Sequence, residues 1–97
     1  MAFRVNTSAA AWKDDLTTSA TSARTTLNVS LRVIRFNAFD EDVYVKFGDN
    51  TIVAVLGEGL RIPAGQTELV EPPVGATYFA YITANAGKLN VCYGENE

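Results

Sequence analysis

Short runs of alternating polar and apolar residues, each ended by turn residues, fill this chain of 97 residues from about residue 27 onward. Residues 43–47 are a clear example, because apolar side chains stand at every second position and Gly48, Asp49 and Asn50 follow at once. Roughly six or seven such runs recur at a spacing of about 8–12 residues, and no helical period interrupts them. The pattern predicts an all-β fold, a small antiparallel β-sandwich or barrel over residues 27–97.

The alternation also predicts where the strands and the core lie. The expected strands are residues 28–33, 43–47, 51–56, 60–62, 67–70, 77–83 and 88–93. The phase slips at Ile34, and a β-bulge or an edge crossing near Arg35 would account for the slip. The side chains expected to supply most of the core are Val29, Leu31, Val33, Val45, Phe47, Ile52, Ala54, Ile62, Leu69, Ala80, Ile82, Leu89 and Val91.

Residues 1–26 have a different composition. From Thr7 to Thr26, 14 of 20 residues are Ser, Thr or Ala, so this segment holds too few bulky side chains to form its own core. We therefore predict an extended N-terminal arm over residues 1–26 that becomes ordered only on another surface. A chain that lacks this arm is expected to keep a folded β-domain.

The arm is expected to fasten the protein to its neighbours. Its Thr-rich half can add a strand to an exposed sheet edge of an adjacent subunit. Its large apolar side chains are isolated from one another, so each can enter a separate surface pocket; they are Phe3, Val5, Trp12 and Leu16. Trp12 is expected to contribute most, because a large buried aromatic side chain dominates most interfaces.

The composition excludes much of enzyme chemistry. The chain has no histidine, which rules out Ser-His-Asp and Cys-His nucleophiles, an imidazole base and a His-ligated metal. Its single cysteine, Cys92, allows neither an internal disulfide nor a thiolate metal site. The net charge of −3 argues against binding to nucleic acid. We expect no catalytic residue, no cofactor and no metal, and a binding or structural protein instead of an enzyme.

Two groups of side chains need an interpretation. The acidic residues 40–42, with Asp49 and Asn50, could supply oxygen ligands for calcium, but their spacing matches no calcium loop, so they are interpreted as turn residues. Tyr44, Tyr78 and Tyr81 could form a subunit interface or a shelf that stacks against sugar rings. The interface is favoured, because tyrosine is enriched in subunit interfaces.

Four segments in a fixed order carry a family resemblance; they are residues 31–37 (LRVIRFN), 43–49 (VYVKFGD), 62–65 (IPAG) and 74–82 (VGATYFAYI). Residues 29–95 thereby resemble a family of small virion proteins of tailed phages and prophages. The resemblance implies an all-β structural protein, in particular a capsid decoration (cement) protein that stabilises the head lattice. The alternatives are a tail, head–tail connector or fibre-hub component, and a small carbohydrate-binding module.

The resemblance implies partners as well as a place. The major capsid protein or other virion subunits would be the partners, and the protein would be made in the host cytoplasm and located in the virion. A β-domain this small is marginal alone, and short strands leave edges that need covering. We therefore expect a homo-oligomer, a trimer in preference to a dimer, because capsid lattices offer threefold positions. No membrane is expected, since the longest apolar run, residues 52–56, is far shorter than the roughly 20 residues of a spanning helix.

Overall fold

The computed structural model describes residues 3–5, 15–27 and 33–96. Their strands are β1 (Phe3–Val5), β2 (Leu16–Thr18), β3 (Ala23–Thr26), β4 (Val33–Phe39), β5 (Val43–Gly48), β6 (Leu60–Ile62), β7 (Thr67–Val70), β8 (Tyr78–Ile82) and β9 (Gly87–Asn96). The predicted all-β fold is confirmed, and the predicted β-domain holds the six strands β4 to β9.

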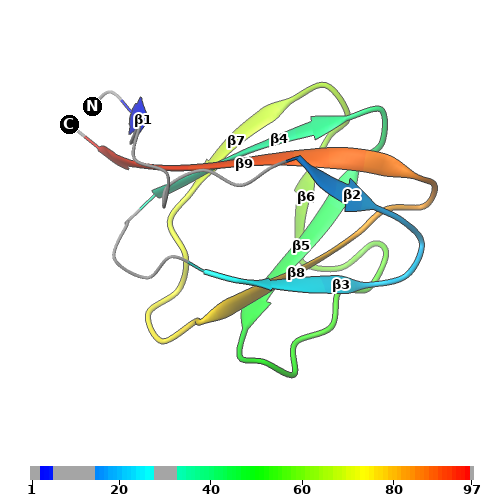
Figure 1. Ribbon diagram of the computed structural model, residues 1–97, viewed down its shortest axis with the longest axis horizontal. Helices are drawn as coiled ribbons and strands as arrows, with labels where there is room; N and C mark the ends of the chain where they lie inside the picture. The colour runs from blue at the N-terminus through cyan, green and yellow to red at the C-terminus, as the bar shows by residue number, and fades with distance from the viewer. Residues whose placement is uncertain (1–2, 6–14, 28–32, 97) are drawn as a thin grey trace.

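Two antiparallel sheets pack face to face as a β-sandwich (Figure 1). In sheet A the order is β1-β9-β4-β7, and β2 also pairs with β9; in sheet B the order is β3-β8-β5-β6. Consecutive strands mostly lie in different sheets, so strands that are distant in the sequence pair with each other. The longest pairing joins β4 to β9, from Val33 opposite Gly94 to Phe39 opposite Lys88.

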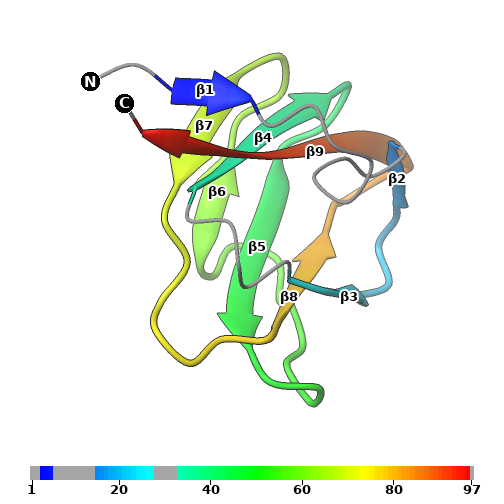
Figure 2. The same ribbon diagram turned by 60° about the vertical axis from the view of Figure 1, so that its left-hand side comes forward.

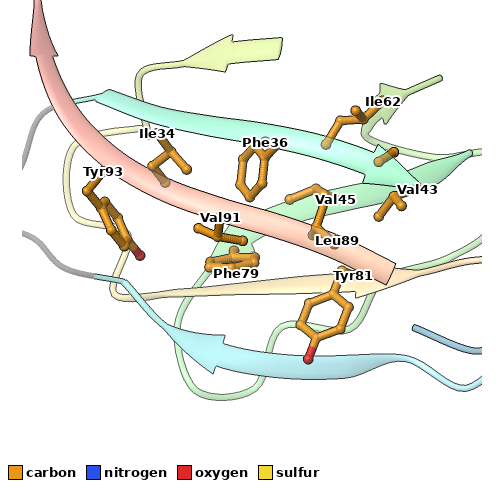
Figure 3. Packing of buried hydrophobic residues seen from close by; sticks show 11 residues of the cluster. Ile34, Phe36, Val43, Val45, Ile62, Phe79, Tyr81, Leu89, Val91 and Tyr93 are labelled. Carbon is orange, nitrogen blue, oxygen red and sulfur yellow. The ribbon is translucent and has the colours of Figure 1, made fainter. Parts of the chain in front are cut away.

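The sheets enclose one apolar core (Figure 3). Its buried members are Ile34, Phe36, Ala38, Val43, Val45, Ile62, Phe79, Tyr81, Leu89, Val91 and Tyr93. Phe36 and Phe79 meet edge to face, with ring centroids 5.4 Å apart and an interplanar angle of 72°. Four residues of the predicted core, Val45, Ile62, Leu89 and Val91, belong to this cluster, and Phe47 packs against it half-buried.

The first strand of the β-domain continues past its predicted end at residue 33, as far as Phe39. β4 begins at Val33 and turns alternate side chains, starting with Ile34, into the core. Its register with β9 runs residue by residue through Arg35, so the predicted bulge there is wrong. Leu69 is 52% exposed, which corrects its assignment to the core, because it stands opposite Arg35 on the outer face of the edge strand β7. The predicted core residues Val29 and Leu31 lie outside the described residues.

Residues 52–55 form no strand, in contrast to the prediction for residues 51–56. They cross the outer face of sheet B instead. There Ala54 forms a second apolar cluster with Ala80 and Ile82, against which Ile52 and Tyr44 pack. Of the predicted core residues, Ile52, Ala54, Ala80 and Ile82 therefore lie outside the sandwich interior, and β8 is buried on both of its faces.

The second half of the predicted arm is part of the sandwich. β2 pairs with β9, and β3 pairs with β8 of the same chain. Leu16, Ala23 and Leu27 pack against the core. The segment is extended and adds strands to sheet edges as expected, but it does so within its own chain. The predicted boundary at residue 27 therefore does not separate residues 15–26 from the domain.

Candidate interaction surface

Exposed apolar side chains gather on the segment that crosses sheet B, residues 52–56, which we call the crossing segment. Val53, Val55 and Leu56 are 55%, 42% and 44% exposed. The other large apolar side chains that are exposed in the described residues are Phe39, Leu69 and Val74, and each lies on a separate element. The crossing segment therefore carries the densest exposed apolar group in the described part of the chain.

Alternation within the crossing segment divides its side chains between two sides. Ile52 and Ala54 face sheet B, whereas Val53 and Val55 face outward. The side chains of Arg24, in β3, and of Ser22, just before β3, hold the segment in place of backbone pairing within a sheet. Arg24 Nη1 donates to the carbonyl oxygen of Ile52 at 3.1 Å, and the backbone N–H of Ala54 donates to Ser22 Oγ at 2.8 Å. These two bonds fix the segment beside β3.

The turn before the crossing segment is fixed by Asp49. Its carboxylate accepts from the backbone N–H of Thr51 at 2.8 Å and from the Thr51 hydroxyl at 2.5 Å. The hydroxyl and then the amide of Thr51 lower the pKa of Asp49. The backbone N–H of Ile52 donates to the carbonyl oxygen of Asp49 at 3.1 Å. This bond closes the turn and so fixes the direction in which the crossing segment leaves it.

The turn after the segment depends on two glycines. Gly57 has a φ of +83°, and the N–H of Glu58 closes the turn onto the carbonyl oxygen of Val55 at 3.1 Å. Gly59 has a φ of +82°, and a Cβ there would lie 2.6 Å from the carbonyl oxygen of Val45. Only glycine allows this close return to β5. The exposed apolar side chains thus stand on a segment that is held at both ends.

A groove borders the crossing segment at each end. One groove, of about 530 Å³, is lined by Thr21, Ser22, Arg24, Ile52 and Val53. The other, of about 340 Å³, is lined by Asp40, Glu41, Asp42, Tyr44, Leu56, Gly57, Ala64 and Ala84. The apolar side chains therefore lie between a groove with one cation and a groove with an acidic wall.

The carboxylates of the acidic wall brace neighbouring loops. Asp42 accepts from Arg61 Nη2 and from the backbone N–H of Ala64, both at 2.8 Å. Glu41 accepts from the backbone N–H and the side-chain amide of Asn85, both at 3.2 Å. Within the described ranges, no group of three or more His, Cys, Asp or Glu side chains is arranged to hold a metal ion. These contacts agree with the interpretation of residues 40–42 as turn residues.

We expect Asp42 to link stability to acid pH. The N–H of Ala64 and then Arg61 lower the pKa of its carboxyl below the ordinary 3.8. Because this pKa is lowered in the folded state, the stabilisation is present above pH 3.8 and is lost as the pH falls through the folded value. NMR titration should give a midpoint below 3.8 for Asp42. Arg61→Gln should raise the pKa of Asp42 only in part, since the Ala64 donor remains; an unchanged midpoint would exclude this role for Arg61.

The predicted interface residues do not form one surface. Tyr44 and Tyr78 are half-buried on the outer face of sheet B, opposite Ile82 and Gly48 respectively, and so lie towards different ends of β8. Tyr81 points into the core, where burial raises the pKa of its phenol. This corrects its assignment as an exposed interface residue.

The candidate residues of the predicted arm are also separated. Leu16 packs against the core of its own chain, which corrects its assignment as an anchor for a neighbour's pocket. Phe3 and Val5 lie in β1, and Trp12 lies outside the described residues. The sequence analysis missed Val53, Val55 and Leu56. The available signal was the unbroken apolar run of residues 52–56, which places apolar side chains on both sides of an extended segment, so that covering one side leaves apolar side chains exposed on the other.

No helix capable of crossing a membrane is present among the described residues. Comparison of the chain with protein-family models, with curated proteins and with solved structures finds no match. The resemblance of residues 29–95 to phage virion proteins therefore depends on the sequence segments alone.

Proposed function

We propose that this chain is a structural protein of a tailed-phage particle that decorates the head, and that the crossing segment belongs to the surface with which it binds its neighbours. The observation that carries the binding role is the exposure of Val53, Val55 and Leu56 on a segment held by hydrogen bonds. An apolar group of this kind, bordered by polar grooves, is typical of an interaction site. The place in the head comes from the family resemblance.

The energetics of the crossing segment suit a protein that is bound in many copies. Its three exposed side chains are already about half buried, so covering them contributes about 2–4 kcal/mol per subunit. Little ordering entropy opposes this gain, because the segment is fixed before binding. Contacts of this strength become stable attachment when subunits are joined and bind together.

The proposed partners are the major capsid protein or other virion subunits, together with further copies of this chain. Among the described strands, β6 and β7 each stand at one end of a sheet and pair with a strand on one side only, which favours self-association. A trimer remains our preference over a dimer. We infer a binding role and not a catalytic one, in agreement with a sequence that has no histidine.

Two other functions share part of this support. A tail, connector or fibre-hub component would use an apolar docking segment equally well, and only the location of the protein in the particle separates it from a head protein. A carbohydrate-binding module is less favoured. Its stacking shelf would need Tyr81, which is buried, beside Tyr44 and Tyr78.

Replacing Val55 and Leu56 by serine should release the protein from the particle. The double variant Val55→Ser/Leu56→Ser removes two half-exposed side chains and should weaken binding by roughly 10- to 80-fold, with the fold intact. Cosedimentation with purified heads measures the loss, and electron microscopy of labelled particles assigns the site to head or tail.

The matched control is Val74→Ser, which changes a fully exposed valine on another loop and should leave binding unchanged. If the double variant binds as tightly as the parent chain, the crossing segment is not the docking surface. Labelled protein found on tails would overturn the head assignment and support the tail alternative.

A further inference from the structure

β1 and the end of β9 pair with each other at one margin of the sandwich. Phe3, Arg4 and Val5 stand opposite Asn96, Glu95 and Gly94. In the described part of the chain, β4 accompanies β9 only as far as Gly94. Figures 1 and 2 both show β1 beside the C-terminal tip of β9, at the margin of the molecule. Most of β1 therefore lies along a part of β9 that extends past its pairing with β4.

β2 pairs with the same strand further back, with Leu16 opposite Leu89. Gly94, opposite Val5, and Leu89, opposite Leu16, are five residues apart along β9, which corresponds to about 17 Å. The chain from Val5 to Leu16 has eleven residue steps and can span up to about 36–40 Å. The connection is thus about twice as long as pairing within one chain requires, and β1 can reach a strand outside its own subunit.

The pairing of β1 is also weak by itself. A strand of three residues on a projecting tip is marginally stable in water. The register of the pair aligns Arg4 with Glu95 along the backbone. The same contacts form whether β1 lies on its own β9 or on that of a neighbour, so the local concentration of neighbours decides between the two.

We propose that β1 is exchanged between copies in the assembled protein: β1 of one chain pairs with residues 94–96 of a second copy, while β2 and β3 stay on their own chain. The inference depends on the self-association included in the proposed function, and not on the head as the binding site. Each copy donates one strand and accepts one, so the exchange closes in a dimer or in a cyclic trimer.

Disulfide trapping in the full-length chain distinguishes exchange from pairing within a chain. Residues directly opposite each other in an antiparallel pair have Cα atoms about 4.5–5.5 Å apart, within the range that a disulfide bridges. The variant Arg4→Cys/Glu95→Cys, in a Cys92→Ala parent, is oxidised at high protein concentration and run on a non-reducing denaturing gel. The control Thr17→Cys/Lys88→Cys traps a pair of exposed residues in the β2–β9 register of the same strand.

Exchange predicts that most Arg4→Cys/Glu95→Cys chains migrate as covalent species of two or more chains, and that the control forms only single cross-linked chains. If the largest covalent species on the gel contains three chains, the protein is a trimer, and if it contains two chains, the protein is a dimer. Either result supports exchange. Single cross-linked chains from both variants would overturn it. The same pairs with the buried Cys92 retained repeat the test if the Cys92→Ala parent does not fold. Interchain linkage in a protein that does not bind particles would reject the proposed function and leave the exchange standing.

Discussion

Deleting residues 1–26 is expected to unfold the protein, whereas deleting residues 1–14 should leave a cooperative fold. The longer deletion removes β2 from the edge of β9 and β3 from the edge of β8. It also removes Leu16 and Ala23 from the core margin, and the half-buried leucine alone contributes about 1 kcal/mol. A chain of this length has a total free energy of unfolding of roughly 5–10 kcal/mol. Loss of the β2–β9 and β3–β8 pairing is expected to remove much of what remains of it. The earlier expectation that residues 1–26 are dispensable for folding is therefore replaced.

Urea unfolding followed by far-ultraviolet circular dichroism distinguishes the two deletions. The chain without residues 1–14 keeps β2 and β3 and should show one cooperative transition. The chain without residues 1–26 should show none, or should aggregate through the uncovered edges of β8 and β9. A cooperative transition within about 1 kcal/mol of the full-length chain would mean that β2 and β3 do not stabilise the sandwich.

Strict local alternation was sufficient to predict several strands closely. The predicted strands at residues 60–62 and 67–70 have the bounds of β6 and β7, and the prediction for residues 43–47 is one residue shorter than β5. In residues 43–47 and 60–62 apolar side chains stand at every second position, so the period of two is visible in the sequence, whereas residues 67–70 do not alternate and were bounded by the turn residues on either side. The turn residues that follow each run then fix its end.

The role of residues 15–26 could not be predicted in the same way. Their many Thr and Ser residues indicate an extended chain but do not name the edge that it joins. That edge is set by pairing across the sequence, such as Arg24 opposite Ala80. The low apolar content predicts that the segment cannot form a core of its own and becomes ordered only on another surface. In the structure, a few side chains such as Leu16 suffice, because the rest of the core is already built by β4 to β9.

The candidate surface was missed for a related reason. Residues 78–82 are apolar on both faces, so alternation could not tell which face turns inward. Phe79 and Tyr81 fill the interior, and Ala80 and Ile82 are covered by the crossing segment. A strand that is apolar on both faces predicts that something covers its outer face. Only the tertiary structure shows that residues 52–55 do so and thereby expose Val53 and Val55.

The Phe79 ring is expected to contribute more to stability than any exposed aromatic side chain. It is fully buried at the centre of the core, with ring centroids 5.4 Å from Phe36, 5.9 Å from Tyr81 and 6.3 Å from Phe47. Phe79→Ala removes these contacts and leaves a cavity between the sheets, at a cost of about 3–5 kcal/mol. Since this approaches the roughly 5–10 kcal/mol available to the whole chain, we expect a large unfolded fraction at physiological temperature.

The matched control for Phe79→Ala is Phe39→Ala, the same substitution at a ring that is 39% exposed at the end of β4. It should cost much less, because water already contacts the ring and no cavity forms inside the sandwich. Urea unfolding of both variants gives the comparison. A double-mutant cycle with Phe36→Ala should add a coupling of about 0.5–1.5 kcal/mol, the usual value for an edge-to-face pair. Equal losses for Phe79→Ala and Phe39→Ala would contradict the packing, because a core that surrounds Phe79 on all sides cannot tolerate its removal as well as the surface does.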